Sequence, residues 1–119
     1  MVAPARIFIV PYRDRATHKR DLLACLNRLL DGEDDWEIFF VHQQDARPFN
    51  RGAMKNIGFL LMRDRYPEYY KDITFIFHDV DTRPRYRGQF PYDTIPGVVA
   101  HYHGSYYALG GAFAIKGRD

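Results

Sequence analysis

Thr74-Phe75-Ile76-Phe77-His78-Asp79-Val80-Asp81 is the stretch that decides the fold, because it is an apolar run that ends in two carboxylates. A short run of β-branched and aromatic residues predicts a buried strand. Asp79 and Asp81 would then lie at the carboxyl end of that strand, and open α/β sheets bind ligands in the crevice outside that edge. Two carboxylates there suit a hard divalent cation, especially one shared with a diphosphate. We therefore expect a metal–nucleotide site after this strand.

Two further apolar runs precede this stretch, each followed by a segment with helical periodicity. We expect strands at 5–10, 36–41 and 73–77, the first of them stopped by Pro11. Alternating strands and helices predict an α/β fold with a mostly parallel sheet flanked by helices and right-handed crossovers. The carboxyl ends of the three strands then share one edge. That edge would bring residues 11–15, 42–51 and 79–83 together.

The two helices have distinct start and stop signals. Thr17 or Asp14 could cap the first helix, which buries a leucine-rich face and ends at Asp31-Gly32. The second helix follows Phe49-Asn50-Arg51-Gly52 and ends before Pro67. Its expected apolar face consists of Met54, Ile57, Gly58 and Leu61.

Beyond Asp81 the pattern is less regular. Residues 83–96 hold three prolines and predict a long loop, and 97–103 predict another strand. A last strand at 106–115 is interrupted by Gly110-Gly111, which indicates a bulge or a close approach of the backbone to a ligand. We expect one domain over residues 1–119, because a chain of 119 residues is of single-domain length.

Composition excludes several classes of protein. Hydrophobic residues make up 46% of the chain and charged residues 27%, which are globular values. A net charge of +2 is too mild to imply nucleic-acid binding. Cys25 is the single cysteine, so no internal disulfide is possible, and its place in a leucine-rich helix predicts a small buried hydrophobe. No apolar segment is long enough to span a membrane.

Basic and aromatic residues stand in the turns that the topology brings to the metal–nucleotide edge. A guanidinium recognises phosphate through two hydrogen bonds, so Arg13 and Arg15 are candidates, although in isolation they are better explained as solvated arginines. Phe49 and Arg51 offer a ring for stacking and a further cation. Asp79 and Asp81 could also be ordinary caps or surface charges, and their context favours the metal.

Other sites are weaker. The phosphatase motif Asp-x-Asp-x-Thr is excluded, because Arg83 stands at its fifth position and the motif follows the third strand instead of the first. A zinc site built from His78, His101 and His103 has no cysteine partner, and it stays a minor alternative. Three tyrosines could stack against a sugar or simply pack the core, and the sequence does not separate these roles: Tyr102, Tyr106 and Tyr107.

Four motifs in register resemble the β-1,4-galactosyltransferase family, glycosyltransferase family 7. They are Pro11-Tyr12-Arg13-Asp14-Arg15, Phe49-Asn50-Arg51, Asp79-Val80-Asp81 and Leu109-Gly110-Gly111. The family pattern is Pro-Phe-Arg-x-Arg, Phe-Asn-Arg, Asp-Val-Asp and Phe-Gly-Gly, in this order. The segment from Asn56 to Phe59 resembles the Asn-Val-Gly-Phe of the family. The resemblance covers nearly the whole chain.

The resemblance implies a GT-A fold, a UDP-sugar donor, Mn²⁺ or another divalent cation, and transfer of the sugar with inversion to a hydroxyl of a glycan or glycoconjugate. It implies Asp81 as the metal ligand. The nucleotide-sugar-binding residues carried over by the motifs are Pro11, Arg13, Arg15, Phe49, Arg51, Asp79, Val80, Gly110 and Gly111. A small residue at Ala108, where the family has a bulky one in galactose-specific members, implies tolerance of UDP-GalNAc.

The family's Trp-Gly-Trp-Gly-Gly-Glu-Asp-Asp segment, with its general base, and the later histidine metal ligands are absent from these 119 residues. We therefore expect the N-terminal donor-binding part of the enzyme, with the catalytic base beyond Asp119. One alternative is a non-catalytic sugar-nucleotide or glycan-binding module, and another is an α/β scaffold that binds a protein. We expect a cytoplasmic location for the chain as given, or a Golgi-lumenal one if a membrane anchor has been removed.

Overall fold

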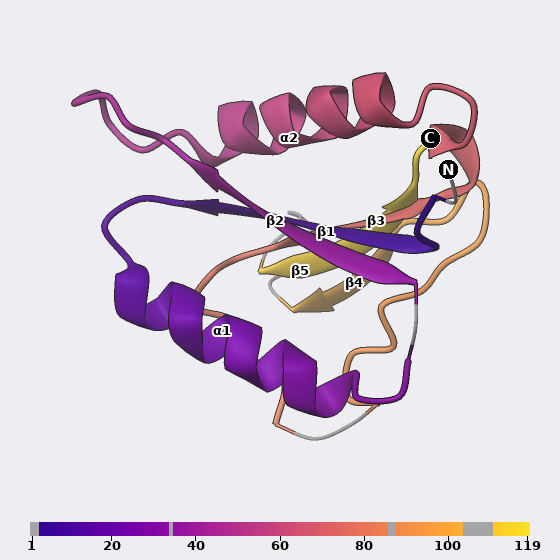
Figure 1. Ribbon diagram of the computed structural model, residues 1–119, viewed down its shortest axis with the longest axis horizontal. Helices are drawn as coiled ribbons and strands as arrows, with labels where there is room; N and C mark the ends of the chain where they lie inside the picture. The colour runs from indigo at the N-terminus through magenta and orange to yellow at the C-terminus, as the bar shows by residue number, and fades with distance from the viewer. Residues whose placement is uncertain (1–2, 34, 86–87, 104–110) are drawn as a thin grey trace.

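The computed structural model describes residues 3–33, 35–85, 88–103 and 111–119, and in it a five-stranded sheet lies between two helices (Figure 1). The strand order is β2-β1-β3-β5-β4. The elements, in chain order, are β1 (Arg6–Tyr12), α1 (Ala16–Leu29), β2 (Trp36–His42), α2 (Arg51–Arg65), the 3₁₀ turn η1 (Tyr70–Asp72), β3 (Thr74–His78), β4 (Ala100–His103) and β5 (Ala112–Lys116).

The sheet is parallel through its first three strands, as the sequence predicts. β1 pairs in parallel with both β2 and β3. β5 runs antiparallel to β3, and β4 runs antiparallel to β5, so every described strand except β5 points the same way. α1 covers one face of the sheet and α2 the other (Figure 1). The carboxyl ends of β1, β2 and β3 therefore meet at one edge.

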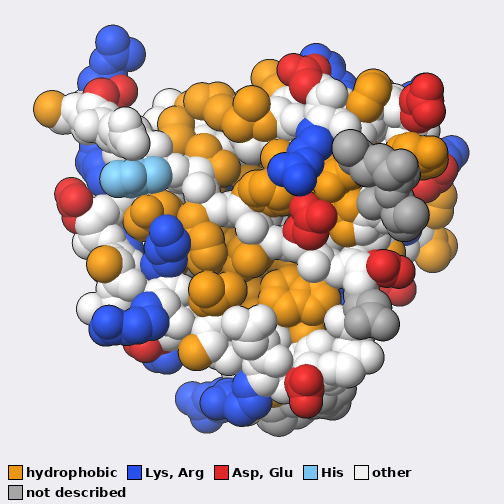
Figure 2. Space-filling model, in the orientation of Figure 1, with side chains coloured by type: hydrophobic (Ala, Val, Ile, Leu, Met, Phe, Trp, Pro, Cys, Tyr) orange, Lys and Arg blue, Asp and Glu red, His pale blue; other side chains and the backbone are white. Residues whose placement is uncertain are grey.

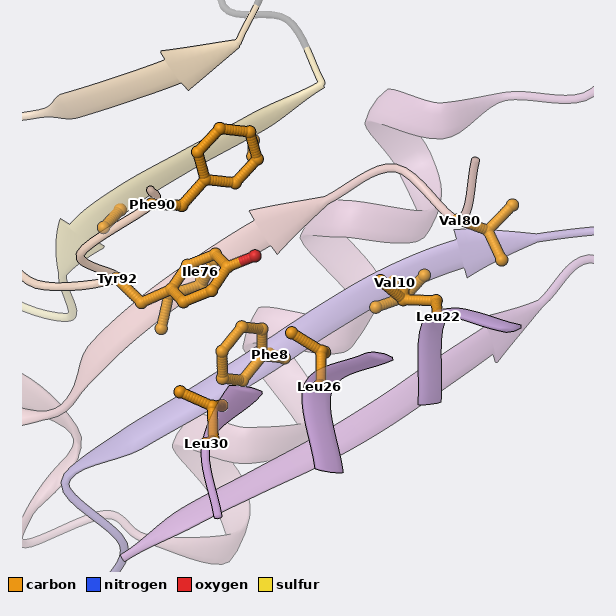
Figure 3. Packing of buried hydrophobic residues seen from close by; sticks show 11 residues of the cluster. Phe8, Val10, Leu22, Leu26, Leu30, Ile76, Val80, Phe90 and Tyr92 are labelled. Atoms are coloured by element: carbon orange, nitrogen blue, oxygen red, sulfur yellow. The ribbon is translucent and has the colours of Figure 1, made fainter. Parts of the chain in front are cut away.

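The core on the α1 side is formed by side chains from both the sheet and the helix. Leucines of α1, among them Leu22 and Leu26, pack on Phe8, Val10 and Ile76 of the sheet (Figure 3). Phe90 and Tyr92, from the segment between β3 and β4, and Val80, just after β3, join the same cluster. Burial of this leucine face is what the sequence predicts. Cys25 is buried on the same helix, also as expected.

The buried face of α2 differs from the predicted one. Gly58 and Met62 are buried, whereas the side chains of Ile57 and Leu61 are 44% and 56% exposed. A Cβ at Gly58 would lie 2.6 Å from Cγ2 of Ile9, so the helix approaches the sheet most closely at this glycine. Because of this close approach, the side of α2 that carries Gly58 and Met62 faces the sheet, and the side that carries Ile57 and Leu61 remains exposed. The prediction placed Gly58 on the buried face correctly, but it included Ile57 and Leu61 and left out Met62.

The boundaries of β1 and α1 also correct the predictions. β1 continues through Pro11 to Tyr12, because β1 pairs with β3 only as far as Ile9. The Tyr12 carbonyl accepts a hydrogen bond from the N–H of Gln43, the residue that follows β2. Backbone groups alternate in direction along a strand, so the Pro11 nitrogen points to the other side, where no strand needs a donor. Arg15 is the N-cap residue of α1 and makes no side-chain capping bond, so neither Asp14 nor Thr17 caps this helix.

The end of the chain agrees in part with the predictions. Strand β4 begins at Ala100, later than expected, and β5 begins at Ala112. Several residues of the expected last strand lie outside the described residues, among them Tyr106, Tyr107, Ala108 and Gly110.

Strand β2 forms one edge of the sheet, and its apolar side chains are only partly buried. Apolar surface occupies the middle of the face shown in Figure 2. Within the described residues, no helix is both long enough and apolar enough to cross a membrane.

Candidate functional site

A pocket of about 410 Å³ lies at the edge where β1, β2 and β3 end. Lys and Arg side chains are visible on the left of Figure 2, the side on which β1 and β2 end in Figure 1. Three segments line the pocket, one after each strand: residues 11–15, then Phe49 and Arg51, then residues 79–81. Every predicted nucleotide or metal residue that the structure describes is among them, except Gly111.

Asp79 is fixed through both its backbone and its side chain. Its backbone N–H donates to the Gly111 carbonyl at 2.7 Å, which ties it to the residue just before β5. Its Oδ2 accepts a charge-assisted bond from Arg51 at 2.8 Å. Its Oδ1 is buried and has no hydrogen-bond partner among the described residues. Burial raises the pKa of Asp79, while the charges of Arg51 and Lys55 oppose that rise. Oδ1 is thus a buried acceptor whose hydrogen-bonding capacity no described residue satisfies.

The cations beside Asp79 come from the start of α2. Asn50 caps this helix, because its side-chain oxygen accepts from the Ala53 N–H at 3.0 Å. The cap fixes Arg51 as the first helical residue, beside Asp79. Lys55 lies one turn further on, with its ammonium 5.2 Å from the centre of the Phe113 ring. Burial lowers the pKa of Lys55, and the negative charge of Asp79 counteracts this.

The two arginines of the first segment differ in their surroundings. The Arg13 guanidinium donates to the carbonyls of Asp45, at 3.2 Å, and Arg47. It also lies 5.8 Å over the ring of Phe49. Arg13 therefore ties the β2–α2 loop to the first segment. Arg15 is exposed, and its side chain makes no hydrogen bond or ion pair with the described residues, so its guanidinium is available to a ligand.

Gln43 organises the β2–α2 loop, and sequence reasoning missed it. It is buried, and its amide donates to the Asp45 carboxylate at 2.8 Å and to the carbonyls of Pro48 and Arg47 at 3.2 and 3.3 Å. Its carbonyl oxygen accepts from the Asn50 N–H at 2.8 Å. In the sequence, the only indication of this role was the position of an amide side chain directly after a strand.

Tyr12 and Asp14 also line the pocket. Both belong to the motif at 11–15, in which the sequence prediction considered mainly the two arginines.

The zinc hypothesis is wrong for His78. This side chain is fully buried, and its Nε2 lies 2.9 Å from the Tyr92 hydroxyl while its Nδ1 lies 2.8 Å from the Asp79 carbonyl. A carbonyl can only accept, so Nδ1 carries the proton and Nε2 accepts from the tyrosine. Within the described ranges, no group of three or more histidine, cysteine or acidic side chains could hold a metal. The side chain of His103 is not among those that the structure describes.

The role of Tyr102 is settled in favour of packing. Its ring stacks on Phe90 with 5.8 Å between the ring centres, and its hydroxyl donates to the Asp93 carbonyl at 2.7 Å. Burial raises the pKa of this hydroxyl. Tyr102 therefore belongs to the core beside Phe90 and Tyr92, and it does not face the pocket.

The carboxylates at the pocket fit a hard divalent cation as a partial ligand set. Asp81 is exposed at the pocket wall, and Asp79 contributes an unpartnered oxygen next to it. Carboxylate oxygens are suitable ligands for Mg²⁺ and Mn²⁺, which commonly complete their coordination with water and phosphate oxygens. Two protein carboxylates at this place therefore suit a cation that arrives with a diphosphate.

Comparison with known proteins decides the family. The model of the N-terminal region of glycosyl transferase group 7 matches residues 3–88. The chain belongs to glycosyl transferase group 7. Human β-1,4-galactosyltransferase 4 is 38% identical over 77 residues, which cover 64% of this chain and 21% of the human protein. A β-1,4-N-acetylglucosaminyltransferase of Lymnaea stagnalis is 37% identical over 89 residues, 71% of this chain and 17% of that protein.

The fold of this group 7 chain matches a solved structure. A crystal structure of a variant of Drosophila β-1,4-galactosyltransferase 7, in complex with manganese, UDP-Gal and xylobiose, superposes with a TM-score of 0.76 at 23% identity. The match covers 94% of this chain and 48% of the Drosophila chain. The expected GT-A fold is thereby confirmed. The chain spans about half of that structure and about a fifth of the human relative.

Proposed function

We propose that the pocket between residues 11–15, Phe49, Arg51 and 79–81 binds a UDP-sugar together with Mn²⁺ or another divalent cation. We propose further that the protein transfers the sugar to a hydroxyl of a glycan, with inversion. The observation that carries this is the pocket itself, in which arginines and carboxylates from three strand ends face one space. The Drosophila neighbour holds manganese and UDP-Gal, which supports the same ligand class here.

Each side chain has a role that follows from its surroundings. Arg15 and Arg51 neutralise the diphosphate, and Phe49 offers a ring face to the uracil. Asp81 holds the cation, with Asp79 as its supporting acid. The bound cation would neutralise the diphosphate leaving group as the sugar–phosphate bond breaks. The remaining proposed donor-site residues shape the pocket or its border: Pro11, Arg13, Val80, Gly110 and Gly111.

Arg51 would exchange partners on binding. It now donates to Asp79, and its own side chain is 56% exposed, so it can turn to a phosphate without unpacking the core. Lys55 would then remain as the positively charged neighbour of Asp79. This exchange frees a carboxylate oxygen at the moment when a cation arrives.

The identity of the donor sugar is a separate proposal. Relatives of this chain include galactosyl- and N-acetylglucosaminyltransferases by name, so the family does not fix the sugar. We propose that Ala108, a small residue two positions before Gly110 in the sequence, admits an N-acetyl group and therefore UDP-GalNAc.

A second candidate function is a binding module without catalysis. Three carboxylates line the described pocket, and the two after β3 already have a partner or a proposed role: Asp79 is paired with Arg51, and Asp81 is the proposed metal ligand. Neither of these two is left to deprotonate an acceptor hydroxyl. The third, Asp14, is exposed in the turn before α1. For the enzyme we place the general base beyond Asp119, in line with the family resemblance.

Calorimetric titration tests the proposal. UDP should bind in the presence of Mn²⁺ and much more weakly with EDTA, and Asp81→Asn should abolish the metal-dependent part. Asp64→Asn, at an exposed position of α2, is the matched control. Absence of UDP binding with Mn²⁺ would refute the proposal and favour a protein-binding scaffold.

Titration with UDP-Gal and UDP-GalNAc tests the Ala108 proposal, which fails if only UDP-Gal binds. Release of UDP from UDP-sugar and acceptor separates the enzyme from the binding module.

A further inference from the structure

His78 is the last residue of β3, and its buried side chain has a hydrogen-bond partner at each ring nitrogen. Its Nε2 accepts from the Tyr92 hydroxyl at 2.9 Å, and its Nδ1–H donates to the Asp79 carbonyl at 2.8 Å. Burial raises the pKa of Tyr92, so its hydroxyl keeps the proton that it donates. The His78 ring therefore links a side chain of the core to the backbone of the pocket.

Tyr92 comes from the segment between β3 and β4, and the core holds it in place. Only 2% of this residue is exposed, and its ring packs edge-on against Phe8 with 4.9 Å between the ring centres (Figure 3). The φ of Tyr92 is 53°, in the left-handed region that bulky residues rarely adopt. Such a conformation persists only where the surrounding structure determines it. The Tyr92 hydroxyl is thus a fixed point to which the His78 ring is tied.

The Asp79 carbonyl, to which His78 donates, also begins the turn that carries Asp81. The Thr82 N–H donates to the same carbonyl at 3.3 Å, which closes a turn over residues 79–82 with Asp81 at its third position. This distance is longer than the roughly 2.7–3.2 Å that is typical of N–H···O bonds, so the Thr82 bond alone holds the turn weakly. The position of Asp81 therefore depends on how firmly the first carbonyl of its turn is held.

We propose that His78 and Tyr92 are positioning residues of the donor site. Through the Asp79 carbonyl they hold this turn, and they thereby keep Asp81 in the place where it takes up the cation. This inference rests on the proposed function, in which Asp81 is the ligand of the cation. The anchor matters most when the donor binds, because Arg51 then leaves the Asp79 carboxylate for a phosphate. The backbone contacts of Asp79 remain at that moment, and His78 supplies one of them.

One pair of variants tests the role of Tyr92 by the affinity for UDP with Mn²⁺, measured by calorimetry. Tyr92→Phe and Tyr102→Phe each remove one hydroxyl from the aromatic cluster around Phe90. The Tyr92 hydroxyl is bonded to His78, whereas the Tyr102 hydroxyl donates to the Asp93 carbonyl. Tyr92→Phe should weaken binding about fivefold, the loss expected when one buried hydrogen bond is removed. Tyr102→Phe, the matched control, should stay within about twofold of the wild type.

A second pair of variants tests the two nitrogens of His78 separately. The amide nitrogen of an asparagine is as many bonds from Cβ as Nδ1 is, so His78→Asn keeps a donor for the Asp79 carbonyl. The amide group of a glutamine reaches as far as Nε2, so His78→Gln keeps only the partner of Tyr92. Both variants remove the buried ring and should lower the urea midpoint. Only His78→Gln loses the anchor of the turn, and it should bind UDP about fivefold more weakly than His78→Asn.

A measurement without ligand separates this inference from the proposed function. Exchange of the Thr82 amide with water, followed by NMR, should be faster in Tyr92→Phe and His78→Gln than in their partner variants. If the wild type does not bind UDP with Mn²⁺, the proposed function fails, and the Thr82 amide still decides whether His78 holds the turn. Equal affinity and equal Thr82 exchange within each pair would overturn the positioning role. A loss of affinity in Tyr102→Phe as large as in Tyr92→Phe would overturn it too, because general packing would then explain both.

Discussion

Replacement of Asn50 by alanine should destabilise the protein without removing a ligand of the pocket. The Asn50 side chain accepts one hydrogen bond, from the Ala53 N–H at 3.0 Å, and it is exposed. Loss of an N-cap costs about 0.5–2 kcal/mol, and this exposed cap belongs near the middle, at about 1 kcal/mol. The Asn50 backbone bond to Gln43 is kept in the variant. For 119 residues the entropy of unfolding is about 0.25 kcal/mol per kelvin, so the midpoint should fall by about 4 °C.

Thermal and urea unfolding of three proteins test this prediction. Asn50→Asp keeps a capping oxygen and should unfold within about 1 °C of the wild type, since aspartate is as good a cap as asparagine. Asn50→Ala should lower the urea midpoint without changing the slope of the transition. An equal loss of stability in Asn50→Asp and Asn50→Ala would show that Asn50 does not stabilise the protein by capping α2. An unchanged midpoint in Asn50→Ala would refute the capping argument itself.

Variants of Asn50 and Arg51 separate an effect on stability from an effect on UDP binding within the motif Phe49-Asn50-Arg51. Asn50→Ala should change UDP affinity less than threefold, because Asn50 faces the helix end and does not line the 410 Å³ pocket. Arg51→Gln should weaken UDP binding tenfold or more, since a charge-assisted bond to phosphate is worth roughly 1.5–3 kcal/mol. Calorimetry with Mn²⁺ present measures both. A larger loss of affinity in Asn50→Ala than in Arg51→Gln would reverse the proposed division of roles.

Three further predictions concern packing, the loop and pH. Gly58→Ala should destabilise by about 1–2 kcal/mol in urea unfolding, because its Cβ would lie 2.6 Å from Ile9, whereas Gly52→Ala meets only ordinary contacts and should be neutral or stabilising. Gln43→Leu should cost about 2–3 kcal/mol and weaken UDP binding, since it removes the bonds that hold the β2–α2 loop. Burial raises the pKa of the Cys25 thiol, so above about pH 8.5 the unfolded chain releases a proton that the folded chain keeps. Stability should therefore fall as the pH rises through about 8.5, and the fall should be shallower in Cys25→Ala.

The parallel sheet and the position of the pocket could be predicted from the sequence, because both follow from the order of local patterns. Each apolar run ends at a polar turn, and the topology of parallel strands brings those turns to one edge. The burial of Leu22 and Leu26 followed from helical spacing in the same way. Such features depend on residues that are near one another in the chain, so periodicity captures them.

Features that depend on long-range contacts could not be predicted. The face that α2 buries is set by the approach of Gly58 to Ile9, residues 49 positions apart. Helical periodicity placed Gly58 on that face but chose Ile57 and Leu61 where the structure buries Met62. Arg13 and Arg15 looked equivalent in the sequence. Only the folded loop shows that Arg13 is engaged by the Asp45 and Arg47 carbonyls, while Arg15 is not. Spacing alone cannot say which of two cations already has a partner.

The two carboxylates after β3 show how burial separates residues that the motif treats alike. Asp79 is mostly buried, with 15% of its side chain exposed, and it is held by Arg51 and by the Gly111 carbonyl. Asp81 is exposed and lies on the wall of the 410 Å³ pocket. A buried carboxylate needs fixed positive neighbours, whereas an exposed one is hydrated and can exchange water for a cation at little cost. The fold therefore makes Asp79 the fixed acid of the pocket and leaves Asp81 exposed, which is why we propose Asp81 as the ligand of the cation.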